Sequence, residues 1–176
     1  MHPWHDIPLG ASIETAFPAV IETPMESRVQ YGLDLVTGLL RVKRIIFSAA
    51  HYPANYGFVP RTLSDDGEPL DVMVLGQDPI HPMSLVRARA IGVLRMVQSG
   101  RRDDKVLAVH VDDPVYEPYR SWRELPSFRL AEIEKFFRDY RALESIETAT
   151  SGFGDPSEAI ALLRETADQY AAARAA

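Results

Sequence analysis

The 176-residue sequence contains no cysteine. This absence excludes disulfide bonds, thiolate nucleophiles and cysteine-based zinc sites, and it fits a reducing cytoplasm. The sequence also lacks an apolar run of about 18 residues, so we expect no membrane span. The opening residues MHPWHDIPLG have no basic segment followed by an apolar one, so they do not have the pattern of a signal peptide. These absences predict a cytoplasmic protein.

Positive charge is in the minority, with 19 Lys and Arg against 25 Asp and Glu and a net charge of -6. Non-specific nucleic-acid binding needs a positive face, so we expect no nucleic-acid partner. Basic clusters at 41–44 and 101–102 are interpreted as solvated strand ends. The five histidines lack zinc-like spacing, apart from the terminal His2 and His5. The length suits one compact domain over residues 1–176.

Residues 17 to 125 alternate between short apolar segments and turn residues. Their spacing of roughly 10 to 15 residues is typical of a small barrel or sandwich. The segments expected to form strands are 17–21, 39–42, 72–75, 85–88, 91–94 and 106–111.

The last third of the chain has helical patterns instead. Ser127 can cap a first helix, and Asp155–Glu158 has the pattern that opens a second one, expected to end near residue 172. Gly152–Gly154 is interpreted as the turn between them. The apolar stripe of the first helix is Leu130, Ile133, Phe137 and Tyr140. Strands followed by helices predict an α+β class, with helices packed against a barrel.

The segment Asp65–Asp71 reads DDGEPLD and places four carboxylates in seven residues, directly before an apolar segment. If it is extended, Asp66 and Glu68 point the same way. An acidic surface turn and a site for hard cations such as Mg²⁺ both explain it. A second acidic pair, Asp103–Asp104, precedes another apolar segment. Two carboxylate groups with cations between them have the composition of a two-metal phosphoryl-transfer site.

Several motifs, in order and spacing over nearly the whole chain, resemble the soluble family I inorganic pyrophosphatases and especially their plant-type branch. They are HPWHDIPLG, RVQYGLD, HYPANYGFVPRTL, DDGEPLDVMVL, RARAIGVLRM, DDKVLAV, DDPVYEPY and FFRDYRALE. The resemblance implies a small OB-like five-stranded β-barrel flanked by C-terminal helices. It also implies Mg²⁺-dependent hydrolysis of pyrophosphate to two phosphates by a metal-activated water. By resemblance, the protein is expected to be a cytoplasmic homo-oligomer, a hexamer.

The resemblance also assigns roles by position. It implies that Asp66, Asp71 and Asp103 bind metal and that Glu68 activates the water. The residues implied to bind phosphate oxygens are Arg44, Tyr56, Lys105, Tyr140 and Arg141. These types suit the task, because a guanidinium forks onto phosphate, an ammonium neutralises charge and a phenol donates a hydrogen bond. Tyr52 and Asn55 match positions that line the family's site, although turn structure also explains Asn55.

Five residues depart from the family's pattern: Gln30 for lysine, Gly32 for glutamate, Glu68 for aspartate, Gln98 for aspartate and Arg141 for lysine. The extra methylene of Glu68 shifts the base by about 1 Å, and such a shift can cost roughly 10²-fold in rate. Asp104 is a candidate to replace the carboxylate lost at Gln98. The departures favour slower hydrolysis. They leave open a weakened paralogue that binds pyrophosphate or a nucleotide, and a hydrolase for another phosphoanhydride.

Overall fold

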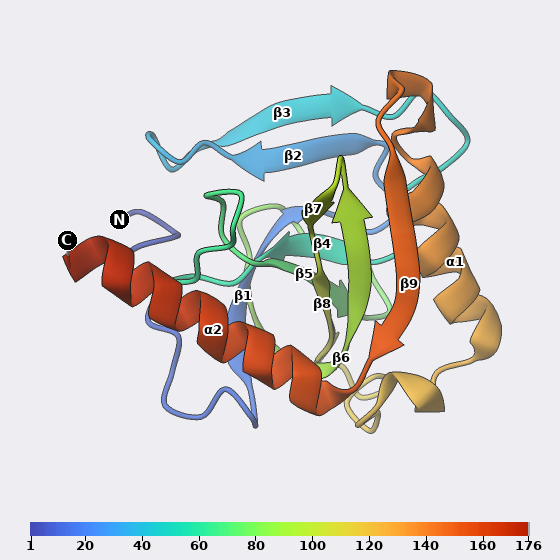
Figure 1. Cartoon of the computed structure of the whole chain (residues 1–176). Coiled ribbons are helices and arrows are strands. Elements are labelled where there is room, and N and C mark those ends of the chain that lie inside the picture. Colours follow the sequence, from blue (N-terminus) through green and yellow to red (C-terminus); the bar gives the residue numbers. More distant parts are fainter. Residues whose placement is uncertain (176) are drawn as a thin grey trace.

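The computed structural model describes residues 1–175, which form nine strands, two α-helices and two 3-10 helices (Figure 1). In chain order they are β1 (Phe17–Thr23), β2 (Val29–Leu33), β3 (Leu40–Ile45), β4 (Asn55–Phe58), β5 (Asp71–Leu75), β6 (Leu85–Gln98), β7 (Arg101–Arg102), β8 (Lys105–His110), η1 (Trp122–Glu124), α1 (Ser127–Asp139), η2 (Ala142–Glu144), β9 (Thr148–Gly154) and α2 (Pro156–Ala175). No helix in this range is both long and apolar enough to cross a bilayer.

Five strands close into a ring in the order β1-β4-β5-β8-β6, and β6 pairs back with β1. Only the β5–β8 pairing in this ring is parallel. The seam between β1 and β6 is short, since it covers only Phe17 to Val20 on β1. The predicted α+β class with a small five-stranded barrel is confirmed.

The expected strands 85–88 and 91–94 are wrong as separate elements, because both belong to the 14-residue strand β6. The pairing of β6 with β8 shifts register between Ala90 and Gly92, and this irregularity bends the strand without ending it. Gly92 is required by packing, since a Cβ there would lie 2.7 Å from Cδ1 of Trp122. Along its length β6 contacts β1, β8, β7 and β9.

Four strands were not expected from the sequence: β2, β4, the two-residue β7 and β9. The segment Gly152–Gly154, predicted to be a turn, lies in β9, which pairs with β6. In β4, Gly57 permits close approach of β1, because a Cβ there would lie 1.9 Å from the carbonyl oxygen of Val20. Strands β2 and β3 form a separate hairpin, which lies across one side of the barrel in Figure 1, away from α2.

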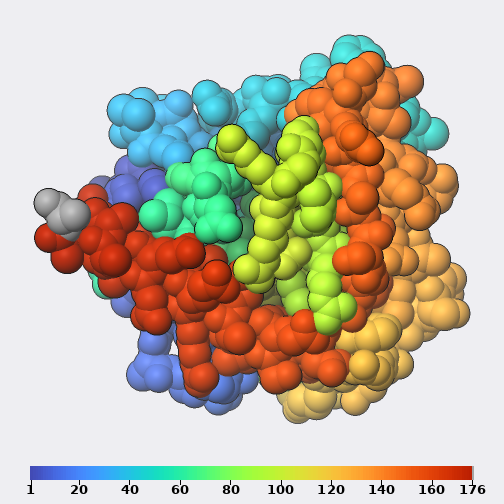
Figure 2. All heavy atoms as spheres, viewed as in Figure 1, coloured from blue at the N-terminus to red at the C-terminus, as the bar shows by residue number. Residues whose placement is uncertain are grey.

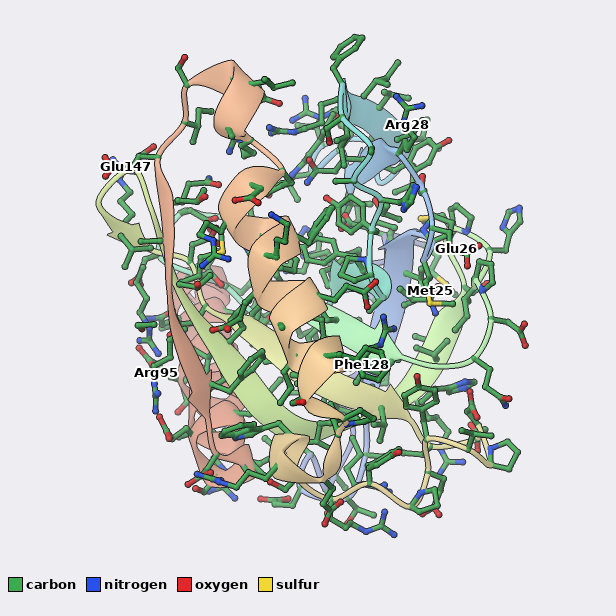
Figure 3. The ribbon with its side chains drawn as sticks, turned by 90° about the vertical axis from the view of Figure 1, so that its right-hand side faces the viewer. Met25, Glu26, Arg28, Arg95, Phe128 and Glu147 are labelled. Atoms are coloured by element: carbon green, nitrogen blue, oxygen red, sulfur yellow. The ribbon has the colours of Figure 1, made fainter. Side chains whose placement is uncertain are left out.

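The two faces of β5 and β8 contribute to two different apolar cores, as the alternation of side chains along a strand requires. On one face, Ala159, Leu162 and Leu163 of α2 pack against the barrel. On the other face the core includes α1, which lies across the strands with β9 beside it and Phe128 in its first turn (Figure 3). The helices therefore cover the barrel as predicted.

Both helices begin where the sequence predicted, but their details differ. Pro126 occupies the N-cap position of α1 and makes no side-chain cap, so Ser127 is the first helical residue and not the cap. The buried stripe of α1 consists of Ile133, Phe136 and Phe137. Leu130 and Tyr140 are only partly buried. The second helix continues to Ala175, slightly beyond the expected end.

Candidate active site

A cavity of about 520 Å³ lies between the β2–β3 hairpin and the barrel. Its walls come from the end of β1, the hairpin, β4, the loop before β5, the β6–β8 connection and the end of α1. Figure 2 shows the face on which the hairpin, residues 61–70, β7 and α2 come together. The cavity itself is lined by segments far apart in the sequence, from β1 to the end of α1.

The nine residues to which the resemblance assigned metal, base or phosphate-binding roles all line this cavity: Arg44, Tyr56, Asp66, Glu68, Asp71, Asp103, Lys105, Tyr140 and Arg141. Tyr52 and Asn55 do not line it. Tyr52 packs against Phe136, with ring centroids 4.7 Å apart, in the core beneath α1. The amide of Asn55 bonds to backbone groups of Met25, Asp78 and Ile80 and so fixes loop structure.

The acidic loop before β5 is both a turn and a wall of the cavity. Gly67 has a φ of +85°, and its N–H donates to the Ser64 carbonyl at 3.0 Å. The Asp66 carboxylate accepts from the Glu68 N–H at 2.9 Å, an Asx-type turn. The turn leaves both side chains at the cavity. The two interpretations of this segment are therefore compatible.

Lys105 is the buried cation at the centre of the site. Its Nζ donates to Asp71 Oδ2 at 2.5 Å and to Asp103 Oδ1 at 2.6 Å, and it lies 5.9 Å from the Tyr56 ring centroid. Burial alone would lower the pKa of Lys105, but the two aspartates outweigh it and hold that pKa above its usual value. Burial also raises the pKa of Asp103 against the attraction of Lys105. The ammonium thus holds together two carboxylates that would otherwise repel each other.

Two arginines on the opposite wall share one carboxylate partner, Glu144. Arg44 Nη1 lies 2.5 Å from Glu144 Oε2, and Arg141 Nε lies 3.2 Å from the same oxygen. Glu144 therefore brings two guanidinium groups from distant parts of the chain side by side. Sequence reasoning missed it, although its spacing of three from Arg141 was a local signal.

Gln98 lines the cavity, and its Oε1 accepts a hydrogen bond from the Tyr140 hydroxyl at 3.4 Å. Burial raises the pKa of Tyr140, so its hydroxyl stays a donor. The idea that Asp104 replaces the carboxylate lost at Gln98 is wrong. Its two oxygens accept from the Met96 N–H at 2.9 Å and from Arg102 Nε at 2.7 Å, outside the cavity.

Three further charged residues that line the cavity were missed: Glu22, Arg41 and Lys43. Glu22 is buried in β1, and its Oε1 accepts from the Leu33 N–H at 2.6 Å. A carboxylate within an otherwise apolar strand was the available signal. Lys43 lies in a segment interpreted as a solvated strand end, yet its Nζ lies 2.7 Å from Glu68 Oε2.

Glu22 predicts a pH-dependent stability. Burial, with a contribution from the Asp71 charge, raises its pKa from 4.5 to about 8, while Lys43 opposes and Glu68 adds to this rise. Between these pH values the unfolded chain loses a proton that the folded chain keeps, so stability falls as pH rises. Glutamine resembles the protonated acid, and Glu22→Gln should flatten this decline in urea denaturation with EDTA from about pH 5 to pH 8.

The matched control is Glu26→Gln, because Glu26 is exposed. This variant should keep the wild-type slope of stability against pH. Equal slopes for wild type and Glu22→Gln would contradict the assignment of the decline to Glu22.

The carboxylates fit a divalent cation whose shell is completed by other oxygens. Within residues 1–175 no three Asp, Glu or His side chains converge into a closed metal cage. Mg²⁺ in proteins usually keeps several waters and binds through one or two carboxylates and substrate phosphates. Asp66, Asp71 and Asp103 face a roomy polar cavity, which suits that mode of binding.

Comparison with known proteins places this site in a family. Residues 19–171 match the model of the family described as Pyrophosphatase, inorganic pyrophosphatase. The chain belongs to the inorganic pyrophosphatase family. The family match covers every residue of the cavity, from Glu22 to Arg141.

Individual relatives agree with this assignment. The chain is 46% identical over 170 residues to soluble inorganic pyrophosphatase PPA1 of Solanum tuberosum, covering 97% of this chain and 81% of the relative. It is 47% identical to soluble inorganic pyrophosphatase 2 of Chlamydomonas reinhardtii, covering 96% and 88%. The crystal structure of inorganic pyrophosphatase from Thermus thermophilus superimposes with a TM-score of 0.92 at 31% identity, covering 97% and 99%. The resemblance to the family, including its plant members, is confirmed.

Proposed function

We propose that this chain hydrolyses inorganic pyrophosphate to two phosphates and that Mg²⁺ is the metal it uses. The observation that carries the proposal is a single cavity in which carboxylates and phosphate-binding cations face each other, in a chain of the inorganic pyrophosphatase family. The names of its relatives support pyrophosphate as the substrate. These names favour pyrophosphate hydrolysis over the two alternatives, which are a paralogue that only binds its ligand and a hydrolase for another phosphoanhydride.

The acidic wall supplies the metal and base functions in this proposal. Asp66, Asp71 and Asp103 would hold Mg²⁺, which lowers the pKa of bound water and neutralises phosphate charge. Glu68 accepts the proton of the attacking water, and its partly exposed carboxylate at the cavity suits this role. The water oxygen bonds to one phosphorus as the bridging P–O bond breaks.

The basic wall binds the substrate and the leaving phosphate. Arg44 and Arg141, paired through Glu144, present adjacent guanidinium groups to phosphate oxygens. Lys105 stabilises the charge that develops on the leaving phosphate, in a buried position where its field is strong. Tyr56 and Tyr140 donate hydrogen bonds, since burial raises the pKa of both phenols.

A substrate panel tests this function. Phosphate release from pyrophosphate, tripolyphosphate and ATP would be measured with the purified chain in excess Mg²⁺. Apart from Val42, the cavity is lined by charged, polar or tyrosine side chains. We therefore expect kcat/KM for pyrophosphate to exceed that for ATP by at least roughly 10²-fold. Equal rates on ATP, or no phosphate release from pyrophosphate, would refute the proposal.

We further propose that the chain forms one domain and assembles into a cytoplasmic homo-oligomer, a hexamer, without nucleic-acid or membrane partners. The exposed apolar side chains Ile45 and Phe47, at and beyond the end of β3, support an interface between copies. The net negative charge supports the absence of a nucleic-acid partner, and the absence of cysteine supports the cytoplasmic location. Sedimentation velocity measures the oligomeric state, and a monomer at micromolar concentration would contradict the assembly.

A further inference from the structure

The ion pair of Lys43 with Glu68 joins the two sides of the cavity. Lys43 belongs to β3 of the hairpin, whereas Glu68 belongs to the loop that leads into the barrel strand β5. Their charged atoms lie 2.7 Å apart, with 23% and 44% of the two side chains exposed. The pair therefore connects a hairpin that is not part of the barrel sheet to the proposed general base.

The stem of Lys43 occupies the space that a side chain at position 32 would fill. A Cβ on Gly32 would lie 2.2 Å from Cε, 2.5 Å from Cδ and 2.9 Å from Cγ of Lys43. The backbone of Gly32 is not in the left-handed region, so its conformation does not require glycine. The path of the Lys43 side chain instead uses the space that glycine leaves, and a Cβ at position 32 would displace it.

Lys43 also determines where the Glu68 carboxylate rests. Glu68 shares the cavity with Asp66 and Asp71, and its charge acts on the buried Glu22 nearby. Repulsion among these carboxylates would turn a long, partly exposed side chain toward solvent. Lys105 neutralises the Asp71–Asp103 pair, and Lys43 is the cation paired with Glu68.

We infer that Lys43 is a positioning residue for pyrophosphate hydrolysis: its ammonium holds the Glu68 carboxylate over the cavity, and Gly32 provides the space for its stem. This inference rests on the proposed role of Glu68. A base must be held within a fraction of an ångström of its productive position, and the longer side chain of glutamate needs such a tether.

The first test separates positioning from substrate binding. Lys43→Met keeps the length of the stem but removes the charge, and it should lower kcat roughly 10-fold with KM within about 2-fold. In a Glu68→Gln background the same substitution should have no further effect on kcat. A raised KM with unchanged kcat would make Lys43 a phosphate ligand and overturn the inference. Independent losses in the double variant would overturn it too.

The second test addresses the space at Gly32. Gly32→Ala should lower kcat about as much as Lys43→Met, because the new Cβ displaces the lysine stem, and it should be silent in a Lys43→Ala background. Gly76→Ala is the control, since the φ of Gly76 is not positive and a Cβ there would lie no nearer than 3.4 Å to a neighbouring atom. Thermal unfolding of each variant checks that it is folded. Equal effects of Gly32→Ala in both backgrounds would contradict the coupling.

These outcomes remain distinct from a failure of the proposed function. If Glu68 is not the base, Glu68→Gln alone keeps wild-type kcat. If pyrophosphate is not the substrate, the wild type itself releases no phosphate. If only the positioning role is wrong, Glu68→Gln loses activity while Lys43→Met keeps the wild-type kcat.

Discussion

Lys105→Met should lower kcat for pyrophosphate hydrolysis roughly 10³-fold, because the buried ammonium that stabilises the leaving phosphate is lost. The same change leaves Asp71 and Asp103 facing each other without their shared cation. Removing one partner of such a buried cluster costs about 3–5 kcal/mol, so the metal-free protein should be destabilised by that order. Urea denaturation in EDTA measures the stability, and phosphate release in Mg²⁺ measures kcat.

The control for this substitution is Lys135→Met on α1. Its ammonium pairs with Asp139 at 2.6 Å, but 72% of the lysine side chain is exposed. Exposed pairs contribute less than about 1 kcal/mol, and this site is not part of the cavity, so kcat should not change. We also expect Mg²⁺ to stabilise Lys105→Met more than the wild type, since a divalent cation can neutralise the two aspartates. A folded Lys105→Met variant with kcat within tenfold of the wild type would refute the role of Lys105.

Asp71→Asn should lower kcat/KM by roughly 10³-fold and weaken Mg²⁺ binding, because metal ions contribute several kcal/mol to charge stabilisation in such reactions. Asp71 opens β5, where it pairs with Phe58 of β4, and the next residue, Val72, pairs with both β4 and β8, so the backbone at Asp71 is fixed. Its charge also contributes to the raised pKa values of Glu22 and Tyr56. Calorimetric titration with Mg²⁺ measures the affinity independently of turnover.

Asp65→Asn is the matched control within the same acidic segment. Asp65 is exposed and does not line the cavity, so Mg²⁺ affinity and kcat/KM should stay near their wild-type values. Equal effects of the two substitutions would show that general negative charge matters rather than the position of Asp71. That result would remove Asp71 from the metal-binding set.

Much of the fold and of the site was predictable, because the local residue patterns and the family motifs spread along the chain indicate the same fold and the same site. The apolar segments that form β5 and β8 are buried on both faces. A continuous apolar run of this kind predicts a buried strand even when the strands that pair with it are unknown. The metal candidates Asp66, Asp71 and Asp103 lie just before or at the start of these two strands. Because β5 and β8 run parallel, their starting ends meet, and so do their carboxylates.

The parts that were missed depend on contacts between distant segments. Strand β6 continues through a register shift beside Gly92, where the sequence suggested a break, and Trp122 leaves no room for a side chain at this position. In the hairpin strand β2 the three partly buried residues 29–31 precede two buried ones, so burial does not alternate along the strand. The pairing of Lys43 with Glu68 follows only once this hairpin is placed across the cavity.

The extra methylene of Glu68 gains a physical reason from this arrangement. From the sequence alone, this methylene was expected to shift the proposed base and so to slow hydrolysis. In the folded chain the longer side chain reaches an ammonium on the hairpin, so the departures at Gly32 and Glu68 belong to one local arrangement. We therefore expect the activity to depend on the Lys43–Glu68 pair rather than on either residue alone.

The most direct test of the account compares the wild type with Glu68→Gln during pyrophosphate hydrolysis at increasing Mg²⁺. The wild-type rate should rise from near zero without metal to a plateau. Glu68→Gln should bind Mg²⁺ in calorimetry yet release phosphate roughly 10²- to 10⁴-fold more slowly at the plateau. A wild type that releases no phosphate at saturating Mg²⁺, or a Glu68→Gln variant that turns over at the wild-type rate, would contradict it.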